Sequence, residues 1–227
     1  MTKQHAFKLC LFYFVGYLFL FPVIELFLLD TFQGEFILRF LNAFEWFFYL
    51  GFPFLMIRLV YPWLKKEVYV FLEAPLQNLW TIVKTYGLMM ITSIAFNLIL
   101  LMIFGLENSE NQAQLMEMYS SQPFKALFAS LVFAPIVEEL VFRGALFAPL
   151  RKHRFLLGVL LSSFSFGFLH VYQSLFQGNF SDLMFLFSYA LLGSFMCRVY
   201  DETNSFVSSM LLHFLNNFIS VILTFLI

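Results

Sequence analysis

Charged side chains are scarce in this sequence, since Asp, Glu, Lys and Arg make up only 12% of its 227 residues. A soluble domain carries about 25% charged residues, so this chain has too few to cover a surface that faces water. Hydrophobic residues reach 61%, and the chain contains 35 Phe. The net charge of −1 provides no basic footprint for nucleic acid. The composition therefore predicts an integral membrane protein that does not bind nucleic acid.

Cysteine is also rare. Cys10 and Cys197 lie in or beside apolar runs, and they indicate no disulfide framework. At the N-terminus, Lys3 and Lys8 precede an apolar run that continues from Leu9 to Ile24 and beyond. This run is longer than the roughly 7–15 residues of a signal-peptide core, and no small-residue cleavage site follows it. We therefore expect an uncleaved first transmembrane helix.

Seven stretches are long and apolar enough, or nearly so, to cross a bilayer as helices, which takes about 20 mostly apolar residues. The stretches are continuously apolar and do not alternate, which favours helices over a β-barrel. The expected fold is an all-α, polytopic transmembrane helical bundle of about seven spans. The expected spans are Phe7–Leu29, Ala43–Trp63, Thr81–Leu106, Phe124–Leu150, Phe155–Ser174, Asp182–Arg198 and Ser205–Ile227.

Basic residues are concentrated in alternate loops, which predicts the orientation. If the N-terminus is cytoplasmic, the outer segments contain only Arg39 and Lys125 as basic residues. The positive-inside rule therefore predicts an N-in, C-out topology. The basic residues of the cytoplasmic segments are then Lys3, Lys8, Lys65, Lys66, Arg151, Lys152, Arg154 and Arg198.

The polar stretch after the third span is the best internal boundary. We expect three spans in residues 1–106, a polar extracytoplasmic loop at 107–122 and four further spans in residues 123–227. The segment KKEVYVFLEAPLQNL, between the second and third spans, is too short to cross the bilayer and is expected along the membrane surface.

Three ionisable residues fall inside the fourth span, in the sequence EELVFR. A charge at the bilayer centre costs at least about 2.5–3.5 kcal/mol, so Glu138, Glu139 and Arg143 need partners or a function. Glu139 and Arg143 are four residues apart on one helix face, which predicts an ion pair. Glu138 lies about 100° round the helix. Arg143 then neutralises the carboxylate of Glu139, and the carboxylate of Glu138 is left without a partner and available for chemistry.

Two further motifs place polar side chains at similar depth. FGFLH in the fifth span ends in His170, and HFLNN in the seventh contains His213 and Asn217 on one helix face. Counting 1.5 Å per residue puts Glu138 and His170 at roughly 20 Å depth and the other two at roughly 12–18 Å. All four side chains could therefore meet in one intramembrane cavity, and the sequence indicates no structural partner for any of them.

These residue types suit hydrolysis of a peptide bond. Glu138 would act as general base on a water, and a histidine would protonate the leaving amine. His213 with Asn217 would donate to an oxyanion. Glu138, His170 and His213 would also serve as zinc ligands. The residues are compatible with both a metal-free and a zinc mechanism.

The three motifs, in this order, resemble the signature of the CAAX protease and bacteriocin-processing family of intramembrane peptidases, also called the CPBP or abortive-infection type. EELVFR matches Glu-Glu-x-x-x-Arg, FGFLH matches Phe-x-x-x-His and HFLNN matches His-x-x-x-Asn, over roughly Phe124–Ser220. The resemblance implies catalytic roles for Glu138, His170, His213 and Asn217, with Glu139 and Arg143 organising the site. It also implies a multi-pass membrane protein whose partners are lipid and a peptide or membrane-protein substrate. The small size of the chain is typical of a bacterial member, so a bacterial plasma membrane is the expected location. The role of the protein would be peptide maturation or bacteriocin self-immunity.

Two other functions fit parts of the pattern. A non-catalytic membrane protein could give immunity or regulation by binding a bacteriocin, a pheromone or a sensor kinase. Loss of a signature residue would favour that alternative, and none is lost. A transporter could use intramembrane carboxylates as proton relays, but the chain has no inverted repeat of the kind that transporters show. The loops contain no motif that identifies a substrate or an oligomeric state.

Overall fold

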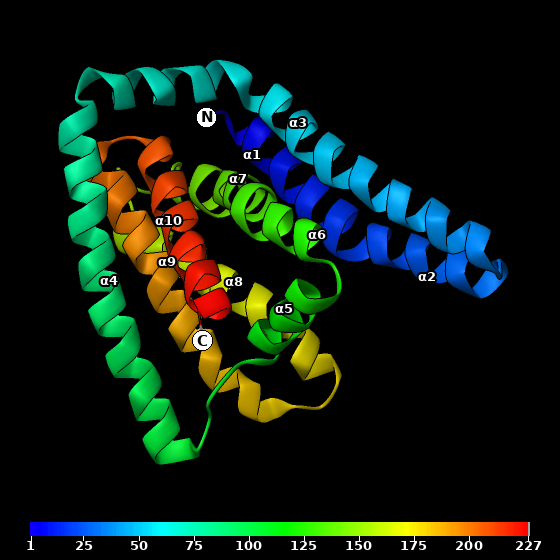
Figure 1. Ribbon diagram of the computed structural model, residues 1–227. Helices are drawn as coiled ribbons and strands as arrows, with labels where there is room; N and C mark the ends of the chain where they lie inside the picture. The colour runs from blue at the N-terminus through cyan, green and yellow to red at the C-terminus, as the bar shows by residue number, and fades with distance from the viewer. Residues whose placement is uncertain (227) are drawn as a thin grey trace.

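The structure is a computed structural model that describes residues 1–226, and these residues are 89% helical with no strands. Six of the described helices are long and apolar enough to cross a membrane. The helices lie beside one another in a bundle, and the C-terminal helices lie in its interior (Figure 1). The all-α membrane fold predicted from the composition is therefore confirmed.

The first span is one continuous helix, Lys3–Thr31. The hydroxyl of Thr2 caps its start by accepting a hydrogen bond from the backbone N–H of His5. Its middle part is wound as a π-helix, a local form that is frequent at functional sites. The three parts of this helix are α1 (Lys3–Cys10), η1 (Leu11–Leu20) and α2 (Phe21–Thr31).

The second span is part of a much longer helix. α3 (Glu35–Glu73) has 39 residues and contains most of the segment expected along the membrane surface. Its second half runs across one end of the bundle to the start of α4 (Pro75–Phe104) (Figure 1). The break falls at Ala74, with φ −144° and ψ 61°, because a proline disfavours helical geometry in the residue before it.

The fourth expected span is a continuous helical segment over residues 123–147. It is not one of the six strongly apolar helices. Lys125, Glu138, Glu139 and Arg143 all lie in it, which explains the difference. The six candidate spans within the described residues are close to the expected number of about seven, and this charged helix occupies the position of the expected fourth span. The segment consists of α6 (Pro123–Phe128), η2 (Ala129–Phe133), α7 (Ala134–Glu139) and η3 (Leu140–Phe147).

The last three spans are α8 (Phe155–Phe176), α9 (Leu183–Thr203) and α10 (Phe206–Leu226), with a short 3-10 turn η4 (Phe180–Asp182) before α9. α8 and α9 pack closely at Gly167, where an added Cβ would lie 2.5 Å from the backbone oxygen of Leu186. These bounds agree with the expected spans to within a few residues. Ile227, the last residue of the expected seventh span, lies outside the described residues.

The segments expected on the cytoplasmic side gather at one end of the bundle. The backbone carbonyl of Glu67 accepts from the Ser205 hydroxyl at 3.0 Å, and its carboxylate accepts from the Phe206 N–H at 2.8 Å. Arg151 donates to the Asn204 side chain at 3.2 Å. The N-terminus lies at the same end (Figure 1). This arrangement agrees with the expected alternation of the loops, and the N-in orientation itself remains a prediction.

The polar stretch 107–122 contains a helix, α5 (Glu110–Ser121), where a loop was expected. Ser109 caps this helix by accepting from the Gln112 N–H at 3.2 Å. Asp182 fixes its first turn, because one carboxylate oxygen accepts from the Glu110 N–H at 3.1 Å. The other oxygen accepts from the Ser174 hydroxyl at 2.6 Å. The end of the bundle opposite the N-terminus is therefore held together by contacts of α5 with α8 and the start of α9.

Candidate active site

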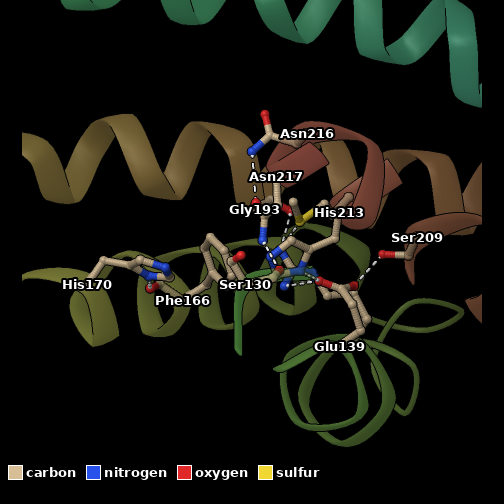
Figure 2. Close-up of polar contacts among 11 residues, drawn as sticks. Ser130, Glu139, Phe166, His170, Gly193, Ser209, His213, Asn216 and Asn217 are labelled. Atoms are coloured by element: carbon tan, nitrogen blue, oxygen red, sulfur yellow. Dashed lines mark hydrogen bonds and ion pairs between the residues drawn. The ribbon is translucent and has the colours of Figure 1, made fainter. Parts of the chain in front are cut away.

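Glu139 is the centre of a buried hydrogen-bond network. Its side chain has no exposed surface, and it accepts hydrogen bonds from Arg143 at 2.8 Å, from His213 at 3.0 Å and from Ser209 (Figure 2). Arg143 belongs to the same helical segment, whereas His213 and Ser209 belong to α10. A buried carboxylate with three donors is well stabilised. Glu139 therefore joins the fourth span to α10.

Arg143 extends this network to two further helices. It is fully buried, and its Nη2 atom donates to the backbone oxygen of Gly193 in α9 at 3.2 Å. Its guanidinium carbon lies 4.6 Å from the centre of the Phe166 ring in α8, which is cation–π geometry. The ion pair predicted between Glu139 and Arg143 is present, and it connects four helices.

Glu138 has a different environment from its neighbour. Its Oε2 atom is buried and has no hydrogen-bond partner among residues 1–226. Glu138 lines a cavity of about 150 Å³ together with His170. The remaining lining residues are Tyr13, Tyr17, Leu18, Asn111, Gln114, Leu169, Tyr172, Gln173 and Ser174. The carboxylate left over by the ion pair therefore faces a mostly polar cavity.

His170 is held in one tautomer. Its Nδ1 atom lies 2.8 Å from the backbone oxygen of Phe166. Since a carbonyl can only accept, Nδ1 carries the hydrogen and Nε2 of the neutral ring has a lone pair. The ring also stacks on Tyr189, with ring centres 4.2 Å apart. His170 is thus fixed beside the cavity with one basic nitrogen.

His213 and Asn217 do not line the cavity. His213 is 3% exposed, and its Nδ1 atom faces Glu139. Because a carboxylate accepts, the hydrogen of the neutral ring is on Nδ1. Asn217 donates to the backbone oxygen of Ser130 at 2.8 Å. The expectation that these side chains have no structural partner is wrong, because their shared helix face packs against the fourth span.

The partner of Asn217 is itself fixed from α5. The Tyr119 hydroxyl donates to the Ser130 side chain at 2.8 Å. Burial raises the pKa of Tyr119, so its hydroxyl stays protonated and keeps this bond. A chain of contacts therefore connects α5, the fourth span and α10.

Phe166 is a site residue to which the sequence reasoning gave no role. Its ring lies between the two histidines, with ring-centre distances of 4.6 Å to His170 and 5.7 Å to His213 (Figure 2). Its carbonyl orients His170, and its ring covers the Arg143 guanidinium. The signal that could have found it is the first letter of the Phe-x-x-x-His motif.

The expected zinc ligands do not form a compact set. Within the described part of the chain, no group of three or more His, Cys, Asp or Glu side chains is placed to hold a metal ion. His213 presents its Nδ1 to Glu139, and Phe166 separates it from His170. Zinc dependence therefore remains a prediction for experiment.

One comparison with known proteins matches the part of the chain that contains most of this site. Residues 120–219, under half of the 227-residue chain, match the family described as type II CAAX prenyl endopeptidase Rce1-like. Curated proteins gave no match, and solved structures gave none either. The matched region contains all three motifs. Residues 120–219 are therefore similar to the Rce1-like family, and the resemblance to the CAAX protease and bacteriocin-processing family is confirmed.

Proposed function

We propose that this protein is an intramembrane endopeptidase that hydrolyses a peptide bond with a water activated by Glu138. One observation carries the proposal: the buried Oε2 atom of Glu138 has no partner, while the adjacent Glu139 has three. Buried polar groups are almost always hydrogen-bonded in folded proteins. An unsatisfied carboxylate beside a polar cavity is therefore well placed to bind a water.

The proposed reaction begins with a proton transfer. The Glu138 carboxylate takes a proton from the water, and the water oxygen forms a bond to the carbonyl carbon of the scissile peptide. The carbonyl π electrons move to the carbonyl oxygen and give a tetrahedral oxyanion. The oxyanion then re-forms the carbonyl as the C–N bond breaks, and the amine nitrogen takes up the proton that Glu138 removed from the water. The products are a carboxylic acid and an amine.

His170 is the proposed proton carrier. Its Nε2 lone pair can accept a hydrogen bond from the water, or accept the proton and pass it to the leaving amine. Stacking on Tyr189 and the bond to Phe166 hold the ring in place. His213 and Asn217, together with Glu139 and Arg143, hold the helices that carry Glu138 and His170 at their separation.

A membrane-associated protein or peptide is the proposed substrate, because most residues that line the cavity belong to helices of membrane-spanning composition. A bacterial plasma membrane is the proposed location. Peptide maturation and bacteriocin self-immunity are two cellular roles that this chemistry would serve. They differ in readout, since maturation produces a shortened native peptide and immunity changes survival in the presence of a bacteriocin.

The decisive variants are Glu138→Gln and Glu138→Ala. Peptides from the membranes and medium of cells expressing each form can be compared by mass spectrometry. We expect products of the wild-type protein to be absent from both variants. Glu25→Gln is the matched control, because Glu25 is another carboxylate in an apolar helix and does not line the cavity.

Unchanged products with folded Glu138→Gln protein would contradict the peptidase proposal. If immunity or signalling persisted in that variant and in His170→Ala, the non-catalytic binding alternative would replace it. Metal analysis and chelation of the purified protein test the zinc prediction. Activity that disappears on chelation and returns with zinc would support a metal, whereas full activity in metal-free protein would exclude one.

A further inference from the structure

Tyr13 reaches the candidate active site from outside the region that matches the family. It lies in η1, in the first span, and its side chain is fully buried. Its ring packs edge-on against Phe142 of the fourth span, with ring centres 5.8 Å apart. Tyr13 lines the same cavity as Glu138 and His170. The N-terminal helix therefore forms one wall of the site.

The hydroxyl of Tyr13 is buried and has no hydrogen-bond partner within residues 1–226. The Oε2 atom of Glu138 is also buried without a hydrogen-bond partner within these residues. Both side chains line one cavity of about 150 Å³. Since an unpaired buried polar group is costly, two such groups around one cavity indicate a polar ligand between them.

The two groups have complementary chemistry. The Glu138 carboxylate only accepts hydrogen bonds, whereas a tyrosine hydroxyl can donate one. His170 has its hydrogen on Nδ1, bonded to Phe166, so its Nε2 is also an acceptor. A cavity that binds both a water and a peptide carbonyl needs a donor as well as these acceptors.

Two of the other donors that line the cavity have partners. The Asn111 amide donates to Tyr189 at 3.3 Å, and the Gln173 amide donates to Tyr172 at 3.2 Å. Asn217, expected as an oxyanion donor, bonds to Ser130 and does not line the cavity. Tyr17, Gln114 and Tyr172 also carry donors and line the cavity. Among the lining residues within 1–226, Tyr13 alone has a donor that is buried and without a partner.

We propose that Tyr13 is a catalytic residue whose hydroxyl donates a hydrogen bond to the scissile carbonyl oxygen as it becomes an oxyanion. This inference rests on the proposed function. The bond strengthens as negative charge develops on the carbonyl oxygen, so it favours the transition state over the bound substrate. Tyr13 remains protonated throughout, and no atom is transferred to or from it.

The test uses the full-length purified protein and a synthetic peptide that spans a cleavage site identified from Glu138-dependent products. Rates are measured for the wild type, Tyr13→Phe and Tyr86→Phe. Tyr86 is the matched control, because its hydroxyl is also buried without a partner but does not line the cavity. We expect Tyr13→Phe to lower kcat on the order of 100-fold with little change in KM.

Stability separates this role from a structural one. Removing an unpaired buried hydroxyl should leave the unfolding temperature unchanged or raise it, in Tyr13→Phe and Tyr86→Phe alike. Tyr86→Phe should keep the wild-type kcat. A kcat of Tyr13→Phe within about threefold of wild type would overturn the proposal. So would a change confined to KM, or a loss of activity that only follows a loss of folded protein.

The same experiment distinguishes the two proposals. If Glu138→Gln is inactive and Tyr13→Phe is active, the oxyanion role of Tyr13 is wrong and the peptidase proposal stands. If no peptide product depends on Glu138, the peptidase proposal fails and the role of Tyr13 fails with it.

Discussion

The Nδ1 atom of His213 lies 3.0 Å from the Oε1 atom of Glu139, although the two residues are 74 positions apart in the chain. The same oxygen accepts from Arg143 at 2.8 Å. Two adjacent carboxylates therefore have opposite environments, since Glu139 is saturated with donors and Glu138 has an unpaired oxygen. Substitution of Glu139 should therefore lower the stability of the protein, whereas substitution of Glu138 should lower its activity.

Glu139→Gln should destabilise the protein by about 3–5 kcal/mol, because it leaves the buried charge of Arg143 without its counter-ion. Glu138→Gln should leave stability close to wild type, since the carboxylate oxygen it replaces has no partner. Thermal unfolding in detergent measures both. Equal unfolding temperatures for the two variants would show that the network around Glu139 does not hold the bundle together.

Phe166→Leu should lower stability by about 2 kcal/mol, because it removes a desolvated cation–π contact with Arg143. Peptide cleavage should fall as well, since the ring that separates the two histidines is lost. Phe168→Leu is the control, because Phe168 is two residues further along α8 and 50% exposed. Similar losses in both variants would argue against a special role for Phe166.

Gly167→Ala should destabilise the packing of α8 against α9 by about 1–3 kcal/mol, the usual cost of overpacking. The added Cβ would lie 2.5 Å from the Leu186 oxygen, too close to be tolerated without a shift of the helices. Gly87→Ala in α4 is the control, because an added Cβ there meets nothing within 4 Å. Unfolding temperatures of the two variants decide the matter, and a tolerated Gly167→Ala would contradict this packing.

The N-in, C-out orientation predicts which loops a membrane-impermeant maleimide reaches on intact cells. Cysteine placed at the exposed Ser120 should be labelled at once. Cysteine at the exposed Lys152 should be labelled only after the membrane is permeabilised. The unsubstituted protein gives the background labelling of Cys10 and Cys197. The reverse labelling pattern would indicate the opposite orientation, N-out and C-in.

Local patterns in the sequence predicted the parts of the structure that depend on short spacing. Long apolar runs gave the spans because lipid requires continuous helices with all backbone groups paired. The Glu139–Arg143 ion pair followed from a separation of four residues on a helix. The fourth span was found despite its charges because its flanking residues are apolar.

Contacts between distant helices were not predictable from such spacing. His213 and Asn217 share a helix face, but the sequence did not indicate that this face meets Glu139 and Ser130. Tyr13 was missed because one tyrosine in an aromatic-rich apolar helix forms no recognisable pattern. α5 was expected as a loop because its polar composition masked the helix that Ser109 and Asp182 stabilise.

The first helix lines the cavity although it lies outside the region that matches the family. The region that matches the family covers only part of the lining of the cavity in which the reaction is proposed to occur, because Tyr13, Tyr17 and Leu18 line one side of it. The boundary of the matched region and the boundary of the cavity lining therefore fall at different places in the chain. Exchange of the N-terminal helices between relatives would change the reaction chamber itself while leaving every signature residue untouched.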